Sequence, residues 1–323
     1  MSPLIELQSV WGWQPAFYLF LGGLGAGTFF VAGLVHFITK GHARVVCAAM
    51  WCAIVFLAVG LGLLLLELSA PLRALMMWQS FSHLNSSWMA IGAWLLFGAI
   101  ICCAIAAVTS TDPLCRLLRI SAGARAKLRA AFTAIGMVLT LCVAVYTGIL
   151  LMDAPGVPFW NTTVLPLLFT VSALDTGVAF TGILLAAFEP DEHRVPRALE
   201  VATACLIVIE AAVLGMFLNT MLAGGNPLFE TMEPGYGATA AASANSWLNG
   251  QLAVPFWGLL VAVGLAAPFV LAIAQVAHHF KRHRAVAISA SLCVLIGGCT
   301  LRFITLLAGT HVDIVANTVA AFF

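Results

Sequence analysis

The sequence consists of long apolar runs separated by short polar connections. About 20 apolar residues in a helix cross the hydrocarbon core of a membrane, and runs of this length recur from one end of the sequence to the other. They are unbroken, unlike the alternating strands of a membrane β-barrel. The pattern therefore predicts about eight transmembrane helices, near residues 15–39, 45–68, 87–109, 129–152, 163–187, 199–222, 253–276 and 285–308.

Composition leads to the same fold class. Hydrophobic residues make up 62% of the 323-residue chain and charged residues 8%, a balance that a soluble domain could not bury. Backbone polar groups in lipid must be satisfied within the chain, which favours helices as the spanning elements. We expect an all-α integral membrane protein, with residues 1–323 forming one polytopic domain arranged as two four-helix bundles. The first residues have no basic region before an apolar core, so they do not indicate a cleaved signal peptide.

Basic residues lie mostly in alternate connections between the predicted helices. The first, third, fifth and seventh connections hold Lys40, Arg44, Arg116, Arg119, Arg125, Lys127, Arg129, Arg194, Arg197, Lys281, Arg282 and Arg284. Because cytoplasmic loops carry the excess of Lys and Arg, we expect both termini on the outer side of a bacterial cytoplasmic membrane. The sixth connection, roughly 223–252, is then an outer loop that serves as a lid or a docking surface. The net charge of +1 argues against nucleic acid as a partner.

A carboxylate is expected at the outer end of the second helix. Glu67 ends the apolar run and is followed by Arg73. The negative end of the helix dipole and partial burial both disfavour an ionised carboxylate there, whereas Arg73 favours it. Such a group suits the acceptance of protons from a quinol. The alternative is an interfacial ion pair between Glu67 and Arg73 that anchors the helix end.

Four further ionisable residues lie within predicted spans. Asp175 and Glu210 fall near the middles of the fifth and sixth helices, Glu200 near the start of the sixth, and Arg302 in the outer half of the eighth. Ionisable groups inside a membrane are costly and point to function, here a proton route. Two alternatives stay open: neutral carboxyls that hydrogen-bond for packing, and the ion site of a secondary transporter at a broken helix, for which Pro166 is the only hint.

Aromatic residues gather at the predicted outer helix ends. Tyr146 could donate a hydrogen bond to a quinone carbonyl or belong to the interfacial belt. For most of the others the belt is the expected position, and these are Trp11, Trp13, Tyr18, Trp78, Trp88 and Trp160.

The sequence offers little for metals or nucleotides. No histidine lies near a helix centre, so a haem held by His36 with His278 or His279 is a weak alternative, and we expect no haem or metal in this protein. The cysteines lack metal-cluster spacing and fit helix packing. The glycine-rich run at 22–27 lies inside a predicted helix, which favours close helix contact over phosphate binding.

The order of several segments resembles one known family. The segments are WGWQPAFYLFLGGLGAG at 11–27, LELSAPLR at 66–73, SSWMAIGAW at 86–94, YTGILL at 146–151, PFWNTTVLPLLFTVSALDTG at 158–177 and LRFITLLAG at 301–309. Together they resemble the membrane subunits of the NrfD/polysulfide reductase family over nearly the whole sequence. The resemblance implies eight helices without haem that exchange electrons between membrane quinones, menaquinone or ubiquinone, and an iron–sulfur subunit carrying four clusters. That subunit usually serves a molybdopterin catalytic subunit.

The same resemblance implies roles for individual residues. It places a quinone site toward the outer face, with Glu67 and Tyr146 at the positions of the family's quinone-proximal acid and tyrosine, and we add Tyr18 and Trp88 to this site. Arg73 and Arg302 match recurring arginines. Asp175 departs from the family pattern, in which a serine is more usual in the SAL-x-TG segment, and it would add a protonatable group at mid-membrane.

Overall fold

The computed structural model describes residues 12–39, 42–67, 88–154, 156–189, 194–226, 235–277 and 284–311, and all regular structure in these ranges is helical. The elements are α1 (Trp13–Ile38), α2 (Ala43–Glu67), α3 (Trp88–Ser110), α4 (Asp112–Leu117), α5 (Ala122–Met152), α6 (Val164–Phe188), α7 (Arg194–Leu222), α9 (Tyr236–Leu248), η2 (Pro255–Ala266), α10 (Ala267–Ala277) and α11 (Arg284–Leu307). Within the described ranges, eight helical spans are long and apolar enough to cross a membrane. The protein is therefore a multi-pass, all-helical membrane protein.

Most observed boundaries lie within a few residues of the predicted ones, and α5 differs most. The helix begins at Ala122, although the apolar run predicted a start at 129. Ser121 caps it, because its hydroxyl accepts a hydrogen bond from the Ala124 N–H at 3.4 Å and so satisfies an end group of the helix. The extra turns carry Arg125, Lys127 and Arg129, and a search for apolar runs does not register such a polar extension.

The sixth connection was predicted to be a loop, and this was wrong for residues 236–248, which form α9. The stretch is rich in alanine, the strongest helix former. Tyr236 and Trp247 of α9 are fully buried, and the Trp247 indole donates a hydrogen bond to the Ile304 carbonyl at 3.1 Å. The described part of this connection is thus anchored in the core of the protein.

Helix α6 is continuous from Val164 to Phe188. Pro166 lies in its first turn, where proline is tolerated because the backbone N–H has no partner within the helix. The hint of a broken helix was therefore wrong, and the transporter alternative loses the observation that supported it. In the seventh span, by contrast, η2 is a π-helix that continues as α10. There Gly264 lies directly against Gly297 of α11, with no room for a Cβ at either position.

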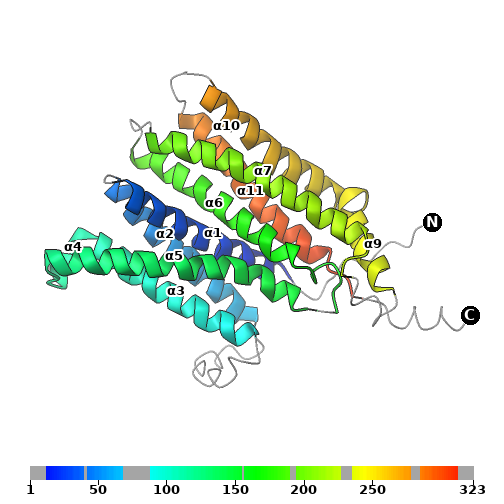
Figure 1. Ribbon diagram of the computed structural model, residues 1–323, viewed down its shortest axis with the longest axis horizontal. Coiled ribbons are helices and arrows are strands. Elements are labelled where there is room, and N and C mark those ends of the chain that lie inside the picture. The colour runs from blue at the N-terminus through cyan, green and yellow to red at the C-terminus, as the bar shows by residue number, and fades with distance from the viewer. Residues whose placement is uncertain are drawn as a thin grey trace, which may run out of the picture.

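The helices pack around two apolar cores (Figure 1). One core joins α1, α2, α3 and α5, and the other joins α6, α7, α9, η2 and α11 with the ends of α1 and α5 nearest α9. The expected division into two four-helix bundles stays a prediction, because Ala173 of α6 also belongs to the first core. Helix α1 lies between the groups and contacts α2, α5, α6 and α11. Its glycine-rich run serves this packing, because Gly27 lies against the backbone of Ala173 and Gly177 in α6.

The two ends of the molecule, which can be followed in Figure 1, differ in the charge of their side chains. We call the end where α2, α5, α7 and α11 begin the basic end, and the opposite end, where α9 lies, the α9 end. Exposed basic side chains at the basic end are Arg44, Arg116, Arg119, Lys127, Arg197 and Arg284. The placement of the α9 end on the outer side of a membrane remains a prediction.

Candidate functional site

Charged side chains meet in the interior between α6, α7 and α11. The charged cluster consists of Ser172, Asp175, Glu210 and Arg302, and all four residues are buried, with exposed fractions of 4% or less. Three of these residues had been picked out singly from the sequence as ionisable groups in apolar runs. The structure brings them together.

Arg302 is the centre of the charged cluster. Its Nη1 donates hydrogen bonds to the Ser172 hydroxyl at 2.6 Å and to the Gly298 carbonyl at 3.0 Å. Its Nη2 donates to the Phe169 carbonyl at 3.2 Å, and the guanidinium lies 5.1 Å from the centre of the Phe169 ring. These contacts fix the cation between α6 and α11. A Cβ built on Gly23 of α1 would lie only 3.0 Å from Nη2, so glycine there makes room for the arginine.

The two acids of the cluster differ in their contacts. Glu210 lies beside Ser172 and interacts electrostatically with Arg302. Asp175 interacts with Glu210, but neither of its carboxyl oxygens has a hydrogen-bond partner among the described residues. A buried ion needs an opposite charge close by, and one arginine balances one carboxylate. The cluster is therefore neutral only when Asp175 and Glu210 together hold one proton.

Two tyrosines form a second candidate site. Tyr18 of α1 and Tyr146 of α5 are 6% and 7% exposed and close enough to interact electrostatically. Leu63 and Leu64 of α2 pack against the apolar core that contains Tyr18. The Tyr146 ring lies directly on Gly92 of α3, where a Cβ would overlap the ring and its hydroxyl. We call this the tyrosine pair. It joins α1, α3 and α5, and α2 is close to it, because a Cβ built on Gly60 would lie 3.5 Å from the Tyr18 carbonyl oxygen.

The other residues predicted for a quinone site are placed only in part. Glu67 is the last residue of α2, at the same end of the molecule as the tyrosine pair, and its side chain lies outside the described part of the structure. Arg73 lies outside the described residues altogether. Trp88 begins α3 and is 44% exposed. It stands one turn before Gly92, so it shares the helix face on which Tyr146 packs.

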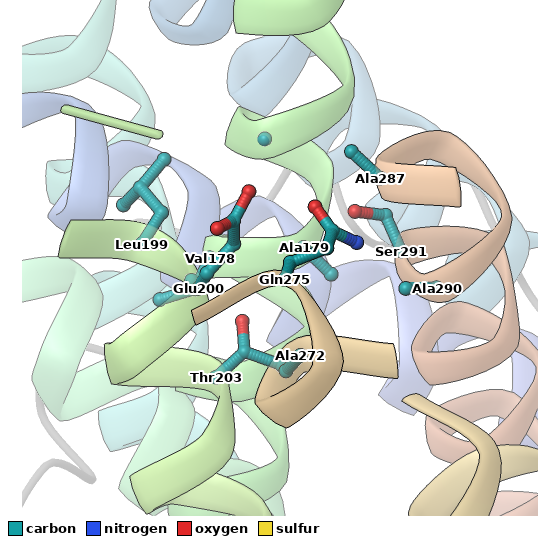
Figure 2. A pocket seen from close by; sticks show the side chains of 11 residues that line it. Val178, Ala179, Leu199, Glu200, Thr203, Ala272, Gln275, Ala287, Ala290 and Ser291 are labelled. Atoms are coloured by element: carbon teal, nitrogen blue, oxygen red, sulfur yellow. The ribbon is translucent and has the colours of Figure 1, made fainter. Parts of the chain in front are cut away.

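Glu200 lies apart from the charged cluster. It lines a cavity of about 410 Å³, a volume that includes space open to the surroundings, between α6, α7, α10 and α11 (Figure 2). From Glu200 to Glu210 the distance along α7 is roughly 15 Å at about 1.5 Å per residue. The cavity wall includes Val178 and Ala179 of α6, about one helical turn from Asp175. A proton route from Glu200 to Asp175 would therefore have to cross this apolar turn of α6.

Several polar residues of these sites were not picked out from the sequence. Ser172 joins Arg302 in the charged cluster, and Thr203, Gln275 and Ser291 line the cavity with Glu200. Hydroxyl residues are common in membrane helices, where they bond to their own backbone, so Ser172 carried little signal. Gln275 could have been noticed in the sequence, because it is a polar amide at the end of an apolar run.

Two aromatic assignments to the interfacial belt were wrong, Tyr18, which is 6% exposed in the tyrosine pair, and Trp160. Trp160 is 2% exposed, and its indole donates a hydrogen bond to the Thr305 carbonyl at 2.7 Å. Burial of an indole with a satisfied N–H is a packing role. Trp13 is 56% exposed, as a belt residue should be, whereas Trp11 and Trp78 lie outside the described residues.

The described histidines lie at the ends of the molecule. His36 is in the last turn of α1, and the His42 ring Nδ1 is in hydrogen-bonding contact with the Glu189 carboxyl group across the basic end. His278 and His279 lie outside the described residues. Within the described ranges, no three side chains of His, Cys, Asp or Glu come together as a metal site.

Comparison with known proteins identifies the family. The sequence model of the family "Polysulphide reductase, NrfD" matches residues 4–314. The C subunit of polysulfide reductase from Wolinella succinogenes is 29% identical over 315 residues, which cover 93% of this protein and 94% of the relative. Protein NrfD homolog of Haemophilus influenzae is 25% identical over 316 residues, again with 93% and 94% covered. The protein therefore belongs to the NrfD/polysulfide reductase family of membrane subunits of respiratory oxidoreductase complexes.

Proposed function

We propose that this subunit binds a membrane quinone, menaquinone or ubiquinone, at the tyrosine pair and exchanges electrons with an iron–sulfur subunit carrying four clusters. A molybdopterin subunit would complete the complex in a bacterial cytoplasmic membrane. The observation that carries the proposal is the meeting of two buried phenols from α1 and α5 in a protein of this family.

The tyrosine pair fits a quinone headgroup chemically. A headgroup is an apolar ring with polar oxygens, and sites for such ligands combine apolar walls with a few placed polar groups. Tyr18 and Tyr146 supply two O–H donors, and the apolar core to which Tyr18 belongs supplies apolar surroundings. When bound, a quinol supplies two electrons and two protons. The phenols would hold the oxygens in place, and Glu67 at the end of α2 would accept a proton.

The direct test of this site is Tyr146→Phe. Loss of one hydrogen bond to a bound ligand costs about 1–3 kcal/mol when its partner is left unpaired, so we expect quinol oxidation by the purified complex to fall roughly tenfold or more. Tyr236→Phe is the matched control, because it removes the hydroxyl of a buried tyrosine in α9 at a distance from the site. Glu67→Gln should also lower turnover while assembly stays intact. Unchanged quinol kinetics in Tyr146→Phe, with normal assembly, would remove the tyrosine from the quinone site.

The position of Tyr146 can be tested without changing the tyrosine. Gly92→Ala places a Cβ where the Tyr146 ring now lies, so the ring must move. Small misplacements in a reacting site can cost about 100-fold in rate, and we expect quinol oxidation to fall by roughly 10- to 100-fold. Gly98→Ala on the same helix is the control, because its Cβ would meet only Leu139 at 3.8 Å. Equal activity of the two variants would show that the position of the Tyr146 ring is unimportant.

We further propose that the charged cluster takes part in proton movement coupled to this electron transfer. Support comes from Asp175, whose carboxyl oxygens are buried without partners among the described residues, and from the excess of one acid over the single arginine. Helix α1 links the sites, because Tyr18 and Gly23 are about 7.5 Å apart along its axis and Gly23 adjoins Arg302. Glu200 would exchange protons with the cavity near the basic end.

A further inference from the structure

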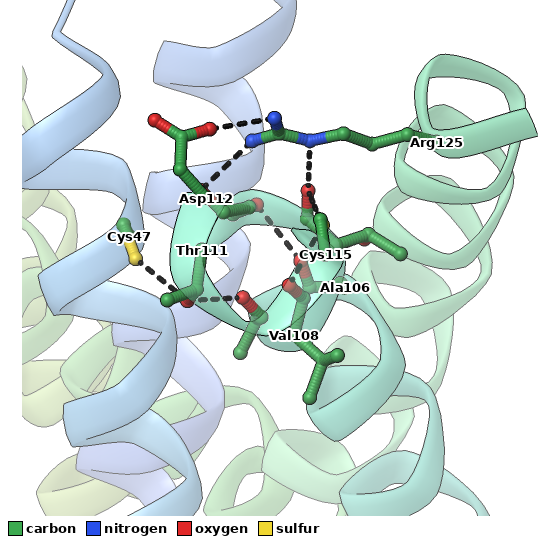
Figure 3. A network of polar contacts seen from close by, with 10 residues as sticks. Cys47, Ala106, Val108, Thr111, Asp112, Cys115 and Arg125 are labelled. Atoms are coloured by element: carbon green, nitrogen blue, oxygen red, sulfur yellow. Dashed lines mark hydrogen bonds and ion pairs between the residues drawn. The ribbon is translucent and has the colours of Figure 1, made fainter. Parts of the chain in front are cut away.

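The short helix α4 at the basic end is held by a network of polar contacts (Figure 3). Arg125 of α5 forms an ion pair with Asp112 at 2.6 Å, and its Nε donates a hydrogen bond to the Thr109 carbonyl at 2.8 Å. On the other side, the Thr111 hydroxyl accepts a hydrogen bond from the Trp51 indole of α2 at 3.0 Å. Helix α4 is therefore fixed to α2, α3 and α5.

The end of α4 presents apolar and basic side chains to the surroundings. Leu117 and Leu118 are 76% and 58% exposed, and the flanking Arg116 and Arg119 are exposed as well. Arg119 adopts a left-handed backbone conformation with φ of 52°, and its N–H donates to the Arg116 carbonyl at 3.2 Å. The backbone therefore turns sharply at Arg119, directly after the two leucines, and in the sequence these leucines lie between two arginines. We call these four residues the α4 patch.

The charge of the α4 patch is not balanced within the described part of the protein. Asp112, the acid of α4, is paired with Arg125, and no ion pair of Arg116 or Arg119 is found among the described residues. Arg44 adds to the positive charge. It lies one turn before Cys47 of α2, whose Sγ is 3.3 Å from the Thr111 hydroxyl.

We propose that the α4 patch binds an anionic phospholipid. Guanidinium groups bind phosphate oxygens through paired N–H donors, and exposed leucines beside them are suited to enter the acyl region below the headgroup. The basic residues mark this end of the spans as the region of the headgroups. The complementary partner is therefore a negatively charged headgroup with its acyl chains, and phosphatidylglycerol is the probe we choose. This inference does not depend on the proposed quinone site.

Lipid retention by the purified complex tests the proposal. We expect native mass spectrometry to detect phosphatidylglycerol bound in preference to phosphatidylcholine in the unaltered complex. Each arginine near an anionic surface contributes about a fivefold gain in binding, so Arg116→Gln/Arg119→Gln should weaken phosphatidylglycerol binding by roughly 30-fold. Leu117→Ser/Leu118→Ser should weaken binding without changing the preference for the anionic headgroup, because it removes only the apolar contact.

The matched control removes the same charge elsewhere at the basic end. Lys127→Gln/Arg284→Gln neutralises two exposed basic residues outside the patch, and it should retain phosphatidylglycerol. Equal loss in this control would overturn the proposal in favour of diffuse surface charge. It would also be overturned if the unaltered complex did not discriminate between the two lipids, or if the arginine variant kept its lipid but lost a protein subunit. Should the arginine variant fail to assemble, the leucine variant and the lipid preference of the unaltered complex decide the question.

Discussion

Replacing both acids of the charged cluster, Asp175→Asn/Glu210→Gln, is expected to destabilise the protein severely, whereas each replacement alone is expected to have a small effect. In either single variant the charged cluster keeps one carboxyl that can ionise to balance Arg302, either Glu210, which interacts with Arg302, or Asp175, which interacts with Glu210. In the double variant it has none, and arginine cannot lose its proton under physiological conditions. An uncompensated buried charge costs about 3–5 kcal/mol.

This non-additivity distinguishes charge balance from ordinary packing. We expect each single variant to cost about 1 kcal/mol or less, which is the typical net contribution of one hydrogen bond. Adding Arg302→Met to the double variant removes the unpaired cation and should recover much of the lost stability, because apolar replacement of a buried charge set is often neutral. Arg302→Met alone should be tolerated better than the double variant, because a carboxyl can become neutral by binding a proton.

Thermal unfolding of the purified complex, with its yield from the membrane, measures these effects. The control is Asp112→Asn, which removes a carboxylate whose side chain is 65% exposed and should change stability little. Additive losses in the double variant, or no recovery in the triple variant, would show that the acids do not serve as alternative counter-charges for Arg302.

The first and last residues of most spans could be predicted from the sequence to within a few residues. Helices that cross the hydrocarbon core need apolar runs of membrane-spanning length. Such runs are easy to recognise in a protein with 8% charged residues. Helix α9 was missed because its 13 residues are too few to form an apolar run of membrane-spanning length. It is held by Tyr236 and Trp247, which are buried within the protein. The polar start of α5 was missed because the helix continues beyond its apolar run.

The candidate sites could be predicted only as single residues. Asp175, Glu210 and Arg302 were conspicuous because charge is rare in apolar runs, but nothing in their spacing showed that α6, α7 and α11 would bring them together. Helix contacts in membranes depend on where small residues permit close approach. Here Gly23 makes room for Arg302, and Gly298 makes room for Thr176 of α6. Glu200 fitted the same pattern, yet it lies at a separate cavity.

The tyrosine pair, too, could not be predicted from the sequence as a site. Tyr146 could be either a belt residue or a ligand on the sequence alone, because both kinds of residue lie near helix ends. The structure buries its ring against Gly92 and near Tyr18, which a belt position would not do. Trp160 was misassigned for the same reason, since a hydrogen bond to a carbonyl 145 residues away in the sequence leaves no local trace.

Asp175→Asn is expected to abolish proton movement while the protein remains stable and assembled. In the neutral cluster a single proton is shared by two acids, so Arg302 stays balanced whichever acid carries it. Transfer of that proton between Asp175 and Glu210 would move charge across the interior without creating an unpaired ion. Asparagine cannot take part in this exchange, and loss of a positioned acid or base typically lowers proton transfer by roughly 100-fold or more.

Charge movement in proteoliposomes during quinol oxidation measures this effect. Asp112→Asn is again the control, because it makes the same chemical change in an exposed carboxylate at the basic end. If Asp175→Asn translocates protons normally, Asp175 is a structural residue of the interior and the shared-proton route fails. The tyrosine pair would be unaffected by that outcome, because quinol oxidation there requires acceptance of the quinol's own protons only. Loss of proton movement with retained quinol oxidation would instead show that electron transfer and proton translocation use different parts of this subunit.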